Sequence, residues 1–67
     1  MDHSIQGYLG RQSTQLLLML LGDYTKHAQI ALDYHVIRIL TKILTARNVP
    51  IPLELQVGIA ECLDEEK

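Results

Sequence analysis

The sequence predicts an all-α fold, a short bundle of three helices completed by self-association. Leucine and isoleucine supply 12 and 7 of the 67 residues, while Phe and Trp are absent. Such aliphatic cores suit the packing of helix on helix. The apolar residues recur with helical spacing, and two short turn-like segments, Gly22–Asp23 and Asn48–Pro52, divide the chain into three. We expect all of residues 1–67 to form a single small domain.

Self-association is predicted from the small size of the chain together with its apolar content. A lone domain of this length buries only about 60% of the surface that its unfolded chain exposes. Small domains make up the difference with disulfides, a metal or a partner chain. The only cysteine is Cys62, so no disulfide within the chain can form. With 48% apolar residues, the chain is not disordered, and we expect a homo-oligomer, with a dimer favoured.

The first helix is predicted over about residues 4–21. Gly7 and Gly10 weaken its first half, so its regular part is expected to begin near Arg11 or Ser13. At 100° per residue, one face gathers the predicted core residues Ile5, Leu9, Leu16, Met19 and Leu20. The other leucines point away from that face and are predicted to contact a second chain: Leu17, Leu18 and Leu21.

The second helix is predicted over about residues 24–47. Gly22 suits a position just past a helix end and Asp23 suits an N-cap, although one long helix through Gly22 stays open as an alternative. The apolar stripe of this helix covers about half its circumference, so we expect two neighbours and assign Ile30, Ile37 and Leu44 to the contact between chains. Asp33 and Gln29 interrupt the apolar half and are expected in a partly wet groove between helices.

The third helix is predicted over about residues 52–65. Pro50 and Pro52 are acceptable before a helix or in its first turn. Residues 51–59 also alternate between apolar and other residues, which is the pattern of a strand. A lone strand has no partner strand in this chain, so helix is favoured and strand is the alternative.

No catalytic, cofactor-binding or metal site is predicted. Asp23 and His27 have the i, i+4 spacing of a chelating pair, but no CxxC or HExxH pattern supplies further ligands. Cys62 is the only thiol that could pair with His27 or His35 for nucleophilic catalysis, and it lies on the apolar face of its segment. We therefore expect a buried cysteine and no enzyme activity.

The predicted function is that of a small protein–protein interaction or assembly module. The alternative is a dimeric DNA-binding regulator that uses Arg38 and Lys42 on the polar face of the second helix. A net charge of −2 and a pI near 5.8 exclude a strongly basic nucleic-acid module, so nucleic acid is the less favoured partner. The longest apolar run is the six residues Leu16–Leu21, far short of a membrane span. With no signal-peptide pattern, we expect a cytoplasmic protein without a membrane partner.

Overall fold

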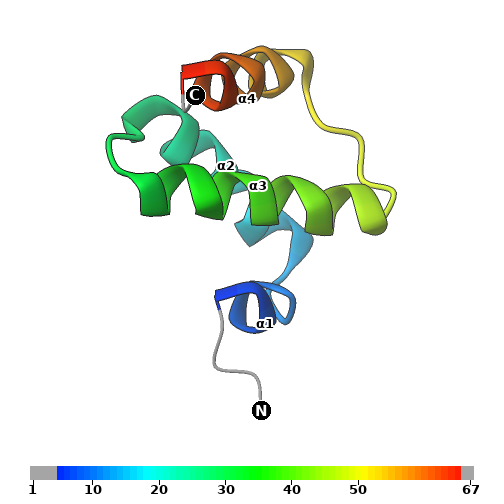
Figure 1. The fold of residues 1–67 in the computed structure, drawn as a ribbon. Helices are drawn as coiled ribbons and strands as arrows, with labels where there is room; N and C mark the ends of the chain where they lie inside the picture. Colours follow the sequence, from blue (N-terminus) through cyan, green and yellow to red (C-terminus); the bar gives the residue numbers. More distant parts are fainter. Residues whose placement is uncertain (1–4, 66–67) are drawn as a thin grey trace.

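The computed structural model describes residues 5–65, which contain helices and no strand. The predicted all-α fold is therefore confirmed, with one helix more than expected in this part of the chain. The helices are α1 (Ile5–Leu9), α2 (Thr14–His27), α3 (Ala31–Ala46) and α4 (Leu53–Glu65). Figure 1 shows α2 and α3 crossing at the centre, with α1 on one side of the pair and α4 on the other. Ser4, where the first helix is predicted to begin, lies outside the described residues.

The predicted first helix is broken in two between Gly10 and Ser13. Ser13 is the N-cap of α2, and its Oγ accepts a hydrogen bond from the backbone N–H of Leu16 at 3.1 Å. This side chain satisfies one of the amides that a helix start leaves without a partner. The prediction that the regular helix begins near Ser13 is confirmed, and the prediction of one continuous helix over 4–21 is wrong.

The predicted break at Gly22–Asp23 is also wrong, because α2 runs on to His27. Gly22 has no positive φ. A Cβ there would lie 3.7 Å from Cδ2 of Leu55, which is ordinary van der Waals contact. The alternative of a helix that continues through Gly22 is therefore the correct one, although α2 ends at His27 and three residues separate it from α3.

The true break between α2 and α3 is set by Asp33. Its Oδ2 accepts hydrogen bonds from the backbone N–H groups of Gln29 at 2.8 Å and Ile30 at 3.2 Å. This carboxylate in the first turn of α3 caps the helix and suits its positive end. Asp33 thus caps α3, and it is also partly buried in a hollow between α2 and α3, as the predicted partly wet groove requires. Gln29 instead lies exposed in the connection before α3, so for this residue the prediction is wrong.

The end of α3 is fixed by a left-handed residue, Asn48, with φ 59°. The N–H of Val49 donates to the Leu44 carbonyl oxygen and the N–H of Asn48 to that of Thr45, both at 3.0 Å. This pair of bonds is a Schellman motif. The proline segment then leads to α4, whose first turn forms when the N–H of Leu55 donates to the Pro52 carbonyl at 3.0 Å. The helical prediction for the third segment is confirmed, and the strand alternative over 51–59 is wrong.

The core is built on α2 and α3, which form the most extensive helix contact in the molecule. Its largest fully buried side chains are Leu17, Leu21, Ile37, Leu40 and Leu44. Leu9 of α1 and Ile59 and Cys62 of α4 complete it from either side. Within the described residues, no helix is both long and apolar enough to cross a bilayer.

The core therefore lies on a different face of α2 from the predicted one. Leu17 and Leu21, assigned above to a contact between chains, are buried inside the single chain, whereas Leu16 and Met19, assigned to the core, are exposed. The prediction is wrong because it carried the phase of Ile5 and Leu9 through one continuous helix. Because the chain is not helical at 10–13, the rotation of α2 about its axis is independent of α1, and Leu17 and Leu21 face the core.

Truncating Leu17 is expected to destabilise the chain far more than truncating Met19. Leu17→Ala opens a cavity in the core and should cost about 2–5 kcal/mol of unfolding free energy. Met19→Ala, two residues along the same helix on its exposed side, should stay within about 0.5 kcal/mol of the parent. Urea unfolding followed by circular dichroism measures both. Equal losses would contradict the assignment of faces on α2.

Alanine substitutions at Gly22 and Asn48 are expected to have opposite signs. Gly22→Ala should stabilise the chain by about 0.5–1 kcal/mol, because alanine suits a helix interior and its Cβ meets Leu55 without a clash. Asn48→Ala should destabilise it by about 1 kcal/mol, because both residues carry a Cβ that disfavours the left-handed region and only asparagine offsets that cost with local hydrogen bonds of its side chain. Thermal unfolding checks both variants. A loss of stability in Gly22→Ala would contradict a helix that passes through this residue.

Candidate functional site

An apolar groove lies where α1 packs beside α2 and the first half of α3. It has a volume of about 340 Å³. Its walls are lined by Ile5, Tyr8, Leu9, Leu16, Leu20, Tyr24, Leu32 and Val36. Two pairs of residues that were predicted to share one helical face thus meet in the groove, although they come from two separate helices: Ile5 with Leu9, and Leu16 with Leu20.

The groove stays open because α1, with only five residues, is too short to cover it. Leu9 and Val36 form its buried floor, whereas Tyr8 and Leu32 are at least half exposed. Apolar area left in water forgoes about 25 cal/mol per Å² that burial would contribute. A contiguous apolar hollow of this kind is typical of a surface that binds another molecule.

Arg47 holds the wall of the groove that α1 provides. Its Nη1 donates to Oγ1 of Thr14 at 3.1 Å, and its Nη2 donates to the carbonyl oxygen of Gly10 at 2.9 Å. The planar guanidinium reaches both acceptors at once. The end of α3 is thereby tied to the α1–α2 connection. Nothing in the local sequence indicates this role, since the contact spans 33 to 37 positions of the chain.

A second exposed apolar surface runs along the outer side of α4. We call it the α4 ridge and define it by Leu53, Val57 and Ala60, which follow one another at i, i+4 and i+7. Leu53 is 74% exposed and Val57 is half exposed. The ridge lies opposite the buried side of α4, which carries Ile59 and Cys62. The ridge was not predicted from the sequence, because Leu53 and Val57 belong to the alternation that also fits a strand.

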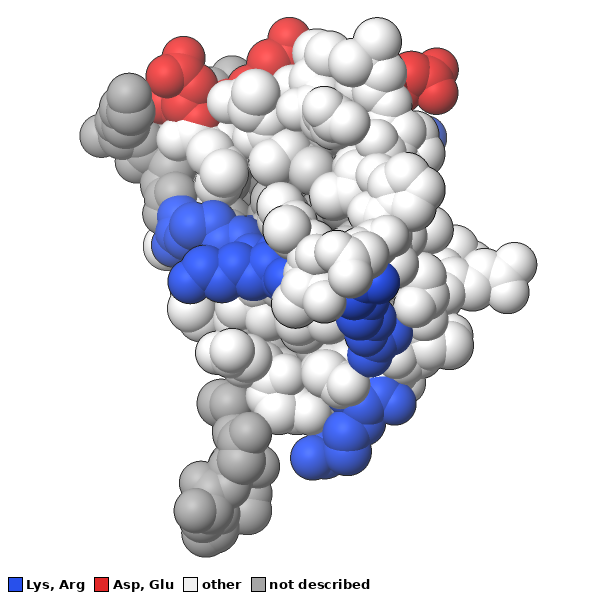
Figure 2. Space-filling model, turned by 90° about the vertical axis from the view of Figure 1, so that its right-hand side faces the viewer, with Lys and Arg blue, Asp and Glu red and all other residues white. Residues whose placement is uncertain are grey.

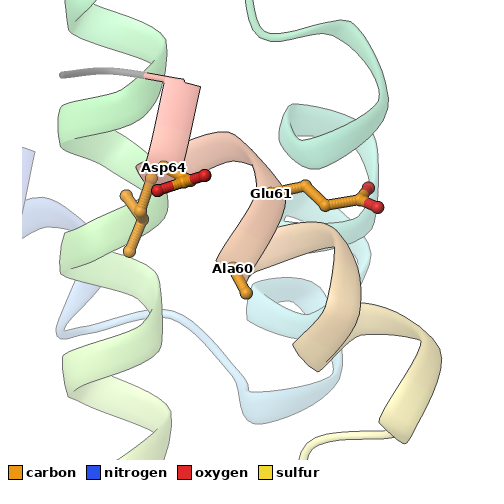
Figure 3. Close-up of a pocket in the computed structure, with 4 residues that line it drawn as sticks. Ala60, Glu61 and Asp64 are labelled. Atoms are coloured by element: carbon orange, nitrogen blue, oxygen red, sulfur yellow. The ribbon is translucent and has the colours of Figure 1, made fainter.

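Acidic side chains accompany the α4 ridge. Ala60, Glu61 and Asp64 line a shallow hollow on α4 together with Leu63. In Figure 3, the side chain of Glu61 extends away from Asp64, so their carboxylates do not converge on one point. This hollow therefore lacks the convergent oxygens that a divalent cation would need.

A polar hollow of about 400 Å³ lies at the junction of α2 and α3, lined by Asp23, Tyr24, His27 and Asp33. Asp23 and His27 are the pair whose spacing suits chelation, and Asp33 is the one further acidic residue in the hollow. Its Oδ2 already accepts two backbone amides. Among the described residues, no group of three or more His, Cys, Asp or Glu side chains could hold a metal ion.

Cys62 is buried, as the sequence predicts. Its Sγ lies 3.4 Å from the carbonyl oxygen of Thr25, to which the thiol donates. His27 and His35, the predicted alternatives for pairing with it, are both exposed. The thiol therefore contributes to the packing of α4 against α2 in the manner of a small apolar residue.

The remaining predicted contact residues separate into core and surface. Ile37 and Leu44 lie in the core together with Leu17 and Leu21, so their assignment to a contact between chains is wrong. Leu18 is partly buried and Ile30 is exposed, so these two alone reach the surface.

Arg38 and Lys42, the predicted nucleic-acid contacts, lie on α3, where Arg38 is partly buried and Lys42 is exposed. Figure 2 shows basic side chains across the middle and lower parts of one face and acidic side chains along its upper edge, the level at which α4 lies in Figure 1. The described part of α4 carries no basic residue, whereas Glu54, Glu61 and Asp64 are acidic. Charge is thus unevenly distributed between α4 and the rest of the molecule.

Comparison of the chain with protein-family models, with curated proteins and with solved structures found no match. The apolar groove, the α4 ridge and the uneven distribution of charge are thus the features that bear on function.

Replacing Arg47 is expected to loosen α1 without unfolding the rest of the chain. Arg47→Met removes both hydrogen bonds but keeps an unbranched apolar stem, and should lower the local stability of α1 by about 1–2 kcal/mol. Amide hydrogen exchange in α1 should then be roughly 5 to 30 times faster. Lys42→Met, on the exposed side of the same helix, is the matched control and should leave that exchange unchanged. Parental exchange rates in Arg47→Met would contradict the role of this residue.

Proposed function

We propose that this chain is a small helical protein–protein interaction module that acts as a homo-oligomer and carries no catalytic activity. The apolar groove is the observation that carries the proposal. Monomeric proteins rarely leave a contiguous apolar hollow of this kind open to water. A second copy of the chain that fills it would also add the buried area that so small a domain lacks.

The exposed large apolar residues support the same proposal by their distribution. Seven described residues fall in this class, and five of them belong to either the groove or the α4 ridge: Tyr8, Leu16, Leu32, Leu53 and Val57. Scattered single residues would be ordinary for a soluble surface, whereas grouping on two elements favours recognition. In this proposal the groove and the ridge replace the buried leucines as the contact between chains.

The buried position of Cys62 supports the absence of catalysis. A nucleophilic thiol needs an accessible sulfur and a neighbouring base or positive charge that favours the thiolate. Cys62 instead donates to the Thr25 carbonyl from inside the α2–α4 contact. The buried sulfur therefore lacks the accessibility that a nucleophile needs.

A DNA-binding regulator is the second candidate, favoured by the basic side chains that Figure 2 shows away from α4. Arg38 and Lys42 would contact phosphate from the exposed side of α3. Affinity for DNA grows with the number of phosphates that are neutralised. Arg38 is partly buried, Arg47 is engaged with Thr14 and Gly10, and acidic residues outnumber basic ones by eight to six in the whole chain. Self-association is therefore the better supported function.

The proposal predicts that the mass in solution exceeds the 7.6 kDa of one chain. Light scattering after size exclusion should give at least twice that mass at low micromolar concentration, and duplex DNA at low salt should not change the elution. A monomeric mass with full helicity would refute self-association. Binding to a duplex that weakens steeply as salt rises would instead support the DNA-binding regulator.

A further inference from the structure

We infer that the chains associate head to tail, with the α4 ridge of one copy seated in the apolar groove of the next. This inference rests on the self-association proposed above and specifies which surfaces meet. The two surfaces differ in shape, and both belong to the same chain. One is a hollow between three helices, and the other is a row of side chains on the outer side of a single helix.

The spacing of the α4 ridge suits insertion into a groove. A helix that lies in an apolar groove presents anchors at i, i+4 and i+7. Leu53, Val57 and Ala60 have this spacing, and the first two are the exposed large apolar residues of α4. The half-exposed Tyr8 and Leu32 of the groove would meet them and lose their contact with water.

A contact between two grooves, or between two α4 ridges, is less favourable than a contact between a groove and a ridge. Two grooves placed face to face would leave a void, and voids forfeit the close contacts that stabilise protein interiors. Two α4 ridges placed face to face would bring Glu54 and Glu61 of one copy toward the same residues of the other. Like charges brought together at an interface oppose association.

The ridge in the groove avoids this repulsion along most of the contact. Residues 5–22, which supply two walls of the groove, contain no acidic residue and only one charged residue, Arg11. One end of the groove adjoins the polar hollow that contains Asp23 and Asp33, because Tyr24 lines both. Along the rest of the groove, the acidic side chains beside the ridge approach walls of uncharged side chains from residues 5–22.

The two surfaces cannot meet within one chain, because α1 and α4 lie on opposite sides of the α2–α3 pair (Figure 1). Contact between unlike surfaces of identical chains is heterologous, and it closes into a ring or extends into an open chain. Each copy then has one groove and one ridge to offer.

Mixing two variants tests this arrangement. The groove variant is Tyr8→Gln/Leu32→Gln, and the ridge variant is Leu53→Gln/Val57→Gln. Each replaces two exposed apolar side chains by neutral polar ones. Each variant alone should associate at least about tenfold more weakly than the parent and therefore give monomers. An equimolar mixture should form a dimer of one groove variant and one ridge variant, and nothing larger, because only one intact groove meets an intact ridge. Light scattering and native mass spectrometry of isotope-labelled chains measure this product.

The matched control is Met19→Gln/Ile30→Gln, which changes two equally exposed apolar residues, 64% and 59%, that belong to neither surface. It should keep the parental mass. Circular dichroism checks helicity, and the single substitutions Leu32→Gln and Leu53→Gln replace any double variant that unfolds. A parent that assembles while the mixture stays monomeric, or a control that dissociates, would overturn the head-to-tail contact and leave self-association standing. A monomeric parent would overturn both.

Discussion

The packing of Leu17 and Leu21 of α2 against the apolar stripe of α3 is the contact on which the rest of the structure depends. These two leucines and their partners Ile37, Leu40 and Leu44 are the largest fully buried side chains. The described part of the chain has no disulfide and no metal-binding cluster. Apolar burial between two helices therefore supplies most of the stability, and α1 and α4 are added to this pair from either side.

The same constraint explains the exposed apolar surface. A chain of this size has more apolar residues than a pair of crossed helices can cover. The short α1 buries only Leu9 among its own side chains and leaves the groove open, and α4 buries one side while Leu53 and Val57 remain exposed. Arg47 fixes α1 in this position through a guanidinium that reaches two acceptors. The surfaces available for association are thus a consequence of how little the terminal helices cover.

Some helix ends follow from the local sequence, and others do not. Ser13 caps α2 as its residue type and position suggest, and the proline segment precedes α4 as expected. Gly22 was expected just past a helix end, since a glycine followed by aspartate suits that position. Instead α2 runs through it to His27, and a Cβ at this position would meet Leu55 only at an ordinary van der Waals distance. Asp33 stands out in the sequence as a polar residue in the apolar half of its helix. Its capping role follows only once α3 is known to begin at Ala31.

The sequence by itself determined the all-α fold class, the buried state of Cys62 and the helical character of residues 53–65. The fold class follows from composition and the buried Cys62 from the apolar face of its segment, whereas the helix follows from the absence of a second strand that could pair with residues 51–59. The tertiary structure decided which leucines face inward and where the groove lies. A run of six apolar residues such as Leu16–Leu21 has no polar face to orient it, so its phase is set by the helix it meets. The break at 10–13 makes the orientation of this run independent of Ile5 and Leu9. Only the packing of the helices brings Ile5 and Leu9 together with Leu16 and Leu20 in one groove.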